Sequence, residues 1–301
     1  VALYQYGNDG LPAQEAYIQQ IVPLTTDLDR VSEELFALRT NGGSEFCGAV
    51  IDRATQTLAW SEGNDVMKAI FIAGNEPFTQ GQVDYRKACR AAIARGIVVN
   101  TIHCGNETAG VNGKWKDGAD LADGTFMTIN HNRQVVAIKA PQDKEIARLG
   151  GKLNETYLAY GTAGRAGLAR QARQDECAEA CAPAGANVQR AIAKSSVHYR
   201  NEAWDLVDAL ASEKLKLEEL KEDQLPENMR KMSAEQRKQF VAEQTRLRAE
   251  LQEKIKKLND ERKKFVAEAR KKAAESGENT LDAAIIECVR TQAAEQGFEV
   301  E

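Results

Sequence analysis

The chain has 301 residues, of which 43% are hydrophobic and 28% charged, and its net charge at pH 7 is −5. This composition predicts a globular protein with one large domain or two smaller ones. The negative charge gives no general attraction to nucleic acid, and no apolar run approaches the roughly 20 residues that cross a bilayer.

The cysteines exclude two classes of small, cross-linked protein. Six cysteines in a chain of this length are too few for a disulfide scaffold. Their spacing matches no zinc-binding pattern. They are Cys47, Cys89, Cys104, Cys177, Cys181 and Cys288.

The N-terminal segments predict a hairpin followed by two helices. Residues 1–7 and 17–24 have strand-like patterns separated by turn residues. A helix is expected from Thr26 to the flexible Asn41-Gly42-Gly43 segment, and a second helix from Cys47 to about Trp60.

The segment 68–102 predicts a βαβ unit. Two short apolar runs, 68–73 and 97–102, flank a helical segment over 84–95. Such runs are typical of strands buried in a parallel sheet. Ligands of these sheets usually bind where strands end, so the loop Gly74–Gly81 is the first candidate site.

Beyond Tyr160 the sequence becomes rich in Ala, Glu, Lys, Arg and Gln, without strand signals. We therefore expect an α/β domain over residues 1–160 and a helical, partly coiled-coil extension over 161–301. Single helices are predicted over 186–210 and 233–275, and a final one over 280–296. The second has an apolar stripe of Phe240, Leu247, Leu251, Ile255, Leu258 and Phe265.

That stripe must be buried against a partner. We favour earlier helices of the same chain, and self-association through the helical tail is the alternative. Basic clusters are interleaved with acidic residues, which predicts a solvated face rather than a nucleic-acid site. They are Lys256-Lys257, Arg262-Lys263-Lys264 and Arg270-Lys271-Lys272.

The order of elements and several motifs resemble a von Willebrand factor A (VWA) domain of a bacterial subfamily with a helical C-terminal tail. The motifs are Leu24-Thr25-x-Asp27-Leu28, Gly42-Gly43-Ser44, Ala73-Gly74-Asn75-Glu76-Pro77-Phe78-Thr79-Gln80-Gly81 and Asn100-Thr101-Ile102-His103-Cys104-Gly105. The resemblance implies a three-layer Rossmann-like sheet that lacks its first strand. It also suggests an exported protein, although no residue shows the compartment.

The missing strand would belong at the centre of the sheet, between the strands at Ala2 and Ala69. Because paired strands lie about 4.8 Å apart, we expect a gap of ~10 Å there. Val1–Glu301 is therefore expected to be a fragment of a longer chain.

The resemblance also implies a metal-ion-dependent adhesion site, from which this sequence departs. The family's Asp-x-Ser-x-Ser element is absent, and Gly74 stands where an Asp is expected. Ser44 replaces the family's Thr, and Asn75 or Glu76 could supply substitute ligands. These three residues are the candidate ligands for Mg²⁺ in a full-length protein.

These observations predict a non-enzymatic protein-binding or scaffolding protein with a degenerate metal site. Its partner would be another protein, bound through loops 41–47, 74–81 and 104–113. The expected binding residues are Ser44, Glu45, Asn75, Glu76, Phe78, Thr79 and Asn106.

Two other interpretations remain open. One is a hydrolase or transferase that uses Glu76, His103 or Cys104 at the same edge. The other is a purely structural coiled-coil assembly. A disulfide between Cys47 and Cys104 is a further alternative in an oxidising compartment.

Overall fold

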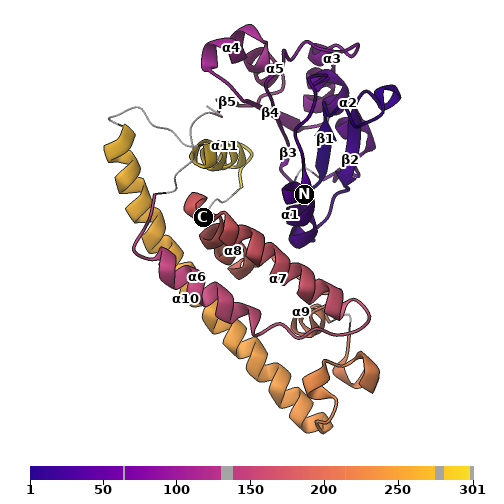
Figure 1. The fold of residues 1–301 in the computed structure, drawn as a ribbon, viewed down its shortest axis with the longest axis vertical. Helices are drawn as coiled ribbons and strands as arrows, with labels where there is room; N and C mark the ends of the chain where they lie inside the picture. Colours follow the sequence, from indigo (N-terminus) through magenta and orange to yellow (C-terminus); the bar gives the residue numbers. More distant parts are fainter. Residues whose placement is uncertain (64, 130–137, 214, 275–280, 299–301) are drawn as a thin grey trace. The chain divides into compact units, whose positions relative to one another are not determined.

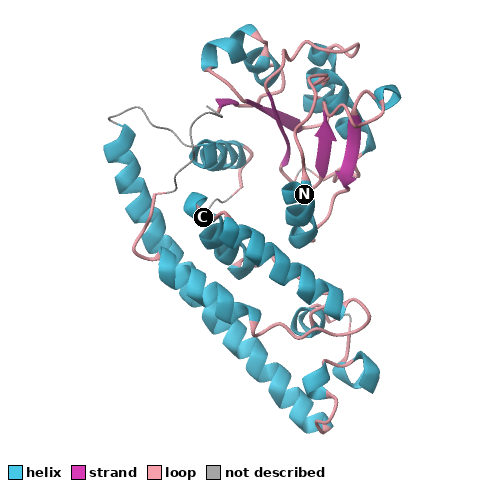
Figure 2. Cartoon of the chain, in the orientation of Figure 1, coloured by secondary structure: helices cyan, strands magenta, loops and turns pink. Residues whose placement is uncertain are grey.

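The computed structural model describes residues 1–301 except 64, 130–137, 214, 275–280 and 299–301. The chain is mixed α/β, as predicted, and divides into two compact units (Figures 1 and 2). The α/β unit comprises Val1–Leu24, Ala37–Val135 and Gly277–Glu301, and the helical unit comprises Thr25–Phe36 and Val136–Ser276. This division differs from the predicted two halves, because each unit contains segments from both.

The βαβ unit predicted from the apolar runs is confirmed. Strands β3 (Lys68–Gly74) and β4 (Ile97–His103) pair in parallel along their whole length, and α3 (Tyr85–Ile93) connects them. Helix α3 begins where the Asp84 side chain accepts a hydrogen bond from a backbone amide of its first turn. Strand β5 (Phe126–Thr128) pairs in parallel with the other edge of β4. Strand β4 is therefore central, and all of its residues are buried.

The predicted N-terminal hairpin is also confirmed. Strands β1 (Leu3–Tyr6) and β2 (Ile18–Val22) pair antiparallel, with the short 3-10 helix η1 (Ala13–Glu15) between them. They form a separate two-stranded sheet, and among the described residues β1 does not pair with β3. Such pairing would have contradicted the expected gap.

The core of the α/β unit lies between the strands and α2 (Cys47–Thr57), α3 and α5 (Trp115–Asp120). Phe78 and Trp115 are its largest fully buried side chains. Their rings meet edge-on, with centroids 4.9 Å apart. This aromatic pair supports the segments that follow β3 and β4.

The last helix, α11 (Leu281–Glu295), belongs to the α/β unit rather than to the predicted extension. Its Cys288 packs beside Ile102 of β4. The amides of Gln292 and the fully buried Asn100 exchange two hydrogen bonds, of 2.7 and 3.1 Å. The docking of α11 thus satisfies a polar group buried in the central strand.

The helical unit consists of α-helices and short 3-10 helices. The α-helices are α1 (Leu28–Ala37, whose last residue falls in the α/β unit), α6 (Asp143–Asn154), α7 (Gly164–Ala180), α8 (Ala186–Ser195), α9 (Leu206–Ala211) and α10 (Ala234–Ala274). The 3-10 helices are η2 (Ala182–Ala184), η3 (Leu217–Glu219), η4 (Glu222–Gln224) and η5 (Glu227–Met229). None of the described helices combines the length and apolar character needed to cross a bilayer.

Helix α10 matches the long helix predicted over 233–275. It begins with a reciprocal capping box, in which the Ser233 amide donates to Gln236 (2.8 Å) and the Gln236 amide donates to Ser233 Oγ (3.2 Å). Ile255 on its stripe is fully buried in a cluster with residues of α6 and α8. The favoured interpretation, burial against helices of the same chain, holds for the centre of the stripe, whereas Phe265 near its end is 39% exposed.

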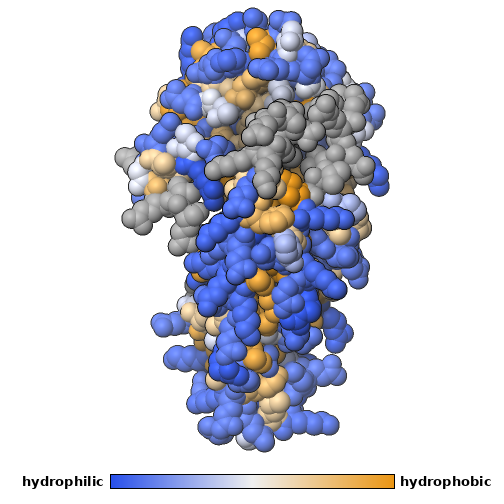
Figure 3. Space-filling model, turned by 90° about the vertical axis from the view of Figure 1, so that its left-hand side faces the viewer, coloured by the Kyte–Doolittle hydropathy of each residue, from blue (hydrophilic) through white to orange (hydrophobic). Residues whose placement is uncertain are grey.

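The predicted solvated face of α10 is confirmed for its lysines but not for Arg262, which is buried and pairs with Asp143 of α6 (2.7 Å). Lys256, Lys257, Lys263 and Lys264 are exposed, and hydrophilic side chains cover most of this surface (Figure 3).

The single helix predicted over 186–210 is wrong. It is divided into α8 and α9 by the segment 196–205. The Asp205 carboxylate ends the interruption, because it accepts hydrogen bonds from the amides of Asp208 (3.0 Å) and Leu158 (2.7 Å). An N-cap aspartate has a non-helical backbone, so it starts a new helix instead of continuing the old one.

Candidate functional site

The segments predicted to bind a partner are joined at the carboxyl ends of β3 and β4. Loop 74–81 follows β3, and α4 (Glu107–Asn112) follows β4. The Cys104 amide donates to the Gly74 carbonyl (2.7 Å), and the Phe78 amide donates to the Gly113 carbonyl (2.8 Å). These backbone hydrogen bonds fix the two segments to each other.

Glu45 connects the third predicted binding segment, residues 41–47, to the loop that follows β3. One of its carboxylate oxygens accepts hydrogen bonds from the amides of Asn75 (2.9 Å) and Glu76 (3.1 Å). Successive backbone N–H groups that converge on an anion form a small anion-binding nest. Glu45 was predicted to contact a partner, but its carboxylate instead anchors the loop after β3.

Gly74 leaves the space that this carboxylate uses. A Cβ atom at position 74 would collide with Glu45 Oε2 and would lie 2.8 Å from the Tyr6 hydroxyl and 2.9 Å from the Trp115 ring. The position where the resemblance expects an aspartate is therefore filled by a carboxylate from another segment.

The prediction that Phe78 lies on the binding surface is wrong. Its ring is fully buried and packs edge-on against Tyr85, with centroids 5.4 Å apart. Helix α5 approaches so closely that a Cβ atom at Gly118 would collide with the ring of Phe78. The Gly- and Pro-rich sequence around Phe78 indicates a loop, but this loop folds back over the core.

The other predicted residues lie at or near the surface. Asn75, Thr79 and Asn106 are exposed, while Ser44 and Glu76 are half-buried. Side-chain amides of Asn75 and Gln80 donate to the two carboxylate oxygens of Glu76, at 3.3 and 3.2 Å. Asn106 caps α4 by accepting a hydrogen bond from the Ala109 amide (2.8 Å).

The thiols at this edge are not activated. Cys47 and Cys104 are both thiols, so the alternative disulfide between them is not formed. Burial raises the pKa of both thiols, and the nearby Glu45 carboxylate raises it further. Both groups therefore stay protonated at neutral pH, whereas a nucleophilic cysteine needs a lowered pKa. His103 is buried beside Trp115, with ring centroids 5.7 Å apart.

The described residues do not fit the cation site that the resemblance implies. Among them, no group of three or more His, Cys, Asp or Glu side chains could hold a metal. The carboxylates of Glu45 and Glu76 are engaged by amides, and Gly74 has no side chain. Ser44 and Asn75 alone do not supply the anionic oxygen ligands that Mg²⁺ prefers.

At the amino ends of β3 and β4 lies a pocket of about 550 Å³. Its lining includes acidic residues (Glu62, Asp123, Glu295) and basic residues (Lys68, Arg95). Both basic side chains donate to backbone carbonyls, of Ser61 and Thr55 respectively. This balance of charge singles out no class of ligand.

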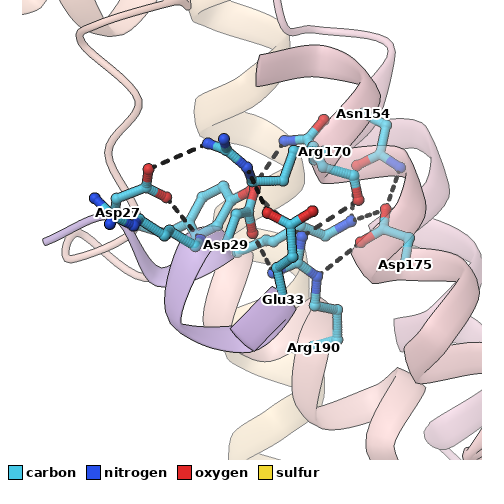
Figure 4. Close-up of polar contacts among 11 residues, drawn as sticks. Asp27, Asp29, Glu33, Asn154, Arg170, Asp175 and Arg190 are labelled. Atoms are coloured by element: carbon cyan, nitrogen blue, oxygen red, sulfur yellow. Dashed lines mark hydrogen bonds and ion pairs between the residues drawn. The ribbon is translucent and has the colours of Figure 1, made fainter. Parts of the chain in front are cut away.

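The helical unit contains a buried ionic network that the sequence analysis missed (Figure 4). Asp29 of α1 is 2% exposed. It pairs with Arg190 of α8 (2.5 Å) and accepts a hydrogen bond from the Tyr199 hydroxyl (2.6 Å). Arg190 also pairs with Asp175 of α7 (2.8 Å), so one guanidinium connects three helices.

Lys194 extends this network into the interior. It is 2% exposed, and its ammonium pairs with Asp175 (2.6 Å) and donates to Asn154 (2.7 Å). Burial lowers the pKa of Lys194 although Asp175 raises it. Burial alone would raise the pKa of Asp175, but Lys194 and Arg190 hold it below its usual value.

A half-exposed rim completes the network, because Arg170 pairs with Glu33 (3.0 Å) and Asp27 (3.4 Å). Arg190 and Lys194 stand four residues apart, which places them on one helix face. This four-residue spacing was the one sign of the network in the sequence. It does not show that Arg190 pairs with Asp29 of α1. The network fixes α1 against α7 and α8.

Comparisons of the chain with protein-family models, with curated proteins and with solved structures gave no match. The resemblance to VWA domains thus rests on the sequence motifs alone.

Proposed function

We propose that this chain is a non-enzymatic protein-binding or scaffolding protein. Its binding surface is formed by the loops at the carboxyl ends of β3 and β4. The observation that carries this proposal is the double hydrogen bond from the amides of Asn75 and Glu76 to Glu45. It holds the loop in place while Asn75 and Thr79 stay exposed. A surface held in advance loses less conformational entropy when a partner binds.

The same geometry gives little support to a hydrolase or transferase. The Cys104 thiol has a raised pKa, and the Glu76 carboxylate is engaged by two side-chain amides. Covalent catalysis needs a nucleophile next to a base that activates it. These contacts favour a binding surface over a reacting centre.

A purely structural coiled coil is also less well supported. The centre of the apolar stripe of α10 is buried by α6 and α8 of the same chain. The end of the stripe differs, because Phe265 is 39% exposed. The buried centre is therefore the part of the stripe that argues against pairing with a second copy.

The test is affinity capture from a cell extract followed by quantitative mass spectrometry. The baits are the unmodified chain, the double variant Asn75→Ala/Thr79→Ala, and Lys264→Ala as an exposed control in the helical unit. We expect the double variant to lose a specific partner at least about tenfold, while the control retains it. Circular dichroism should show all three baits equally folded.

Equal capture by the double variant and the control would contradict the proposed surface. Alkylation of Cys104 by iodoacetamide at pH 7, faster than that of a free cysteine, would favour the enzyme interpretation instead.

A further inference from the structure

Helix α1 belongs to one unit by its contacts and to the other by its place in the sequence. Its segment, Thr25–Phe36, stands between β2 and α2 of the α/β unit, yet it packs with the helical unit. The chain therefore enters α1 from the α/β unit and returns to that unit after it. The contacts that hold α1 thus also fix two of the chain connections between the units.

Little apolar surface holds α1 in place. Of its ten described residues, Asp29 alone is buried. Leu28 is half-buried against a cluster with residues of α6, α8 and α10, whereas Leu35 and Phe36 are 55% and 47% exposed. A docked helix normally buries its apolar stripe and exposes its charges. Helix α1 has the reverse arrangement, so the hydrophobic effect contributes little to its docking.

Charged contacts take the place of apolar ones (Figure 4). At their centre, the buried Asp29 pairs with Arg190 of α8. Three ion pairs among the described residues surround this centre: Glu33 with Arg170 (3.0 Å), Glu33 with Arg173 (3.6 Å), and Asp27 with Arg170 (3.4 Å). The side chains of these outer pairs are 32–69% exposed. In these pairs the segment of α1 supplies the acids, and α7 and α8 supply the bases.

Such a contact can open without unfolding either side. A buried ion pair gains little net free energy, because its attraction is offset by the lost hydration of both charges. When α1 leaves, Asp29 and Arg190 both return to water, and neither charge is left unpaired in the interior. Arg190 also keeps Asp175 of α7 as a partner. Undocking of α1 should therefore cost less free energy than unfolding of α7 or α8.

We propose that α1 is an ionic latch, which leaves the cations of α7 and α8 as one segment while both units of the chain stay folded. The latch responds to ionic strength, because salt screens the half-exposed outer ion pairs. Opening frees the two chain connections that flank α1. The α/β unit then stays joined to the helical unit through the connections that follow β5 and α10.

Hydrogen exchange with mass spectrometry tests the latch in the full chain. An isolated helix of ten residues is marginal in water, so the amides of α1 lose protection whenever it undocks. We expect α1 to exchange at least about tenfold faster than α7 and α8. Because undocking exposes little surface, exchange of α1 should also depend less on urea. Equal exchange of the three helices at every urea concentration would show that α1 leaves only on unfolding, and would overturn the proposal.

Salt distinguishes the latch from ordinary fraying of a helix. Raising NaCl from about 0.1 M to about 1 M shortens the screening length from about 10 Å to about 3 Å. We expect exchange of α1 to become about tenfold faster, since three exposed ion pairs are weakened together. Exchange of α6, in the same unit, should change less than about twofold. Exchange of α1 that is independent of salt would overturn the proposal.

Glu33→Gln removes two of the outer ion pairs and keeps the shape of the side chain. We expect it to speed exchange of α1 about fivefold and to reduce its salt dependence. The matched control is Glu145→Gln, which breaks an exposed ion pair with Arg148 inside α6 and should leave α1 unchanged. Circular dichroism should show that both variants are folded. Equal exchange of α1 in the two variants would show that the outer ion pairs do not hold it, and the latch would be rejected.

Discussion

The two units bury their polar groups in different ways. In the α/β unit the largest buried side chains are aromatic, and buried polar groups such as Asn100 and Gln292 are uncharged. In the helical unit, buried positions include full charges, among them Asp29 and Lys194. An apolar core loses stability in proportion to what is removed. Removing one partner of a buried ion pair leaves an uncompensated charge in the interior, which strongly destabilises the fold.

A second cluster in the helical unit also buries a cation among carboxylates. Arg248 of α10 is 5% exposed and pairs with the fully buried Asp205 (2.6 Å) and with Asp208 (2.9 Å). Its guanidinium also lies 4.1 Å from the centre of the Tyr157 ring. The long helix is therefore held to α9 and to the segment after α6 by one cation.

The largest expected effect comes from removing one charge of the network in Figure 4. Asp29→Asn keeps the shape of the side chain but leaves Arg190 with Asp175 as its remaining anionic partner. We expect the free energy of unfolding of the helical unit to fall by about 3 kcal/mol. Hydrogen exchange of peptides from α7 and α8 in rising urea measures this change.

The control is Glu243→Gln, which removes one partner of the exposed ion pair between Glu243 and Arg246. Exposed pairs contribute little to stability, so no measurable change is expected. If both variants behave alike, the network does not hold the helical unit together.

The sequence predicts the parts of this fold that depend on local periodicity. The apolar runs of β3 and β4 and the stripe of α10 are each visible within a short window. The buried network is not, because Asp29 and Arg190 are 161 residues apart. The return of α11 to the α/β unit has the same cause, since the bonds between Asn100 and Gln292 link residues 192 apart.

The candidate site shows a similar limit. The sequence identifies the loop after β3 and its exposed residues Asn75 and Thr79. It does not predict that Glu45 turns inward or that Phe78 enters the core, because both depend on packing against other segments.

Gly74→Ala should reduce the stability of the α/β unit, by less than Asp29→Asn reduces that of the helical unit. The added methyl group would collide with the carboxylate of Glu45 and crowd the ring of Trp115. Forcing a carbon atom into a packed site typically costs 1–3 kcal/mol, so we expect a loss of about 2 kcal/mol. Hydrogen exchange of β3 and β4 peptides in rising urea measures it, and capture of a partner through the loop should weaken as well.

Gly151→Ala is the matched control for this substitution. Gly151 lies in α6, and a Cβ atom there meets nothing within 4 Å. Alanine should stabilise the helix by about 0.5–1 kcal/mol. A loss of stability from both variants would show that the packing around Gly74 is not the cause.

The smallest effect is a difference in pH dependence between the units. In the helical unit, the pKa of Asp175 is lowered by its cationic partners. An unfolded aspartate has a pKa of about 3.9. The stabilisation from Asp175 is thus complete above that value and is lost as the pH falls through the lower folded pKa. In the α/β unit, burial raises the pKa of Cys104. The stability of the α/β unit should therefore fall as the pH rises above about 8.5, where an unfolded thiol ionises and the buried one does not.

Asp208 acts in the opposite direction at acid pH, because burial and then the Asp205 carboxylate raise its pKa. As the pH falls through its folded pKa, Asp208 gains a proton and its cost decreases, which opposes the loss from Asp175. Urea unfolding of the helical unit between pH 3 and 6 should therefore be compared for the unmodified chain and Asp175→Asn. The difference between the two curves isolates Asp175, and it should shrink as the pH falls below about 4. A difference that does not change with pH would mean that Asp175 contributes through its shape and not through its charge.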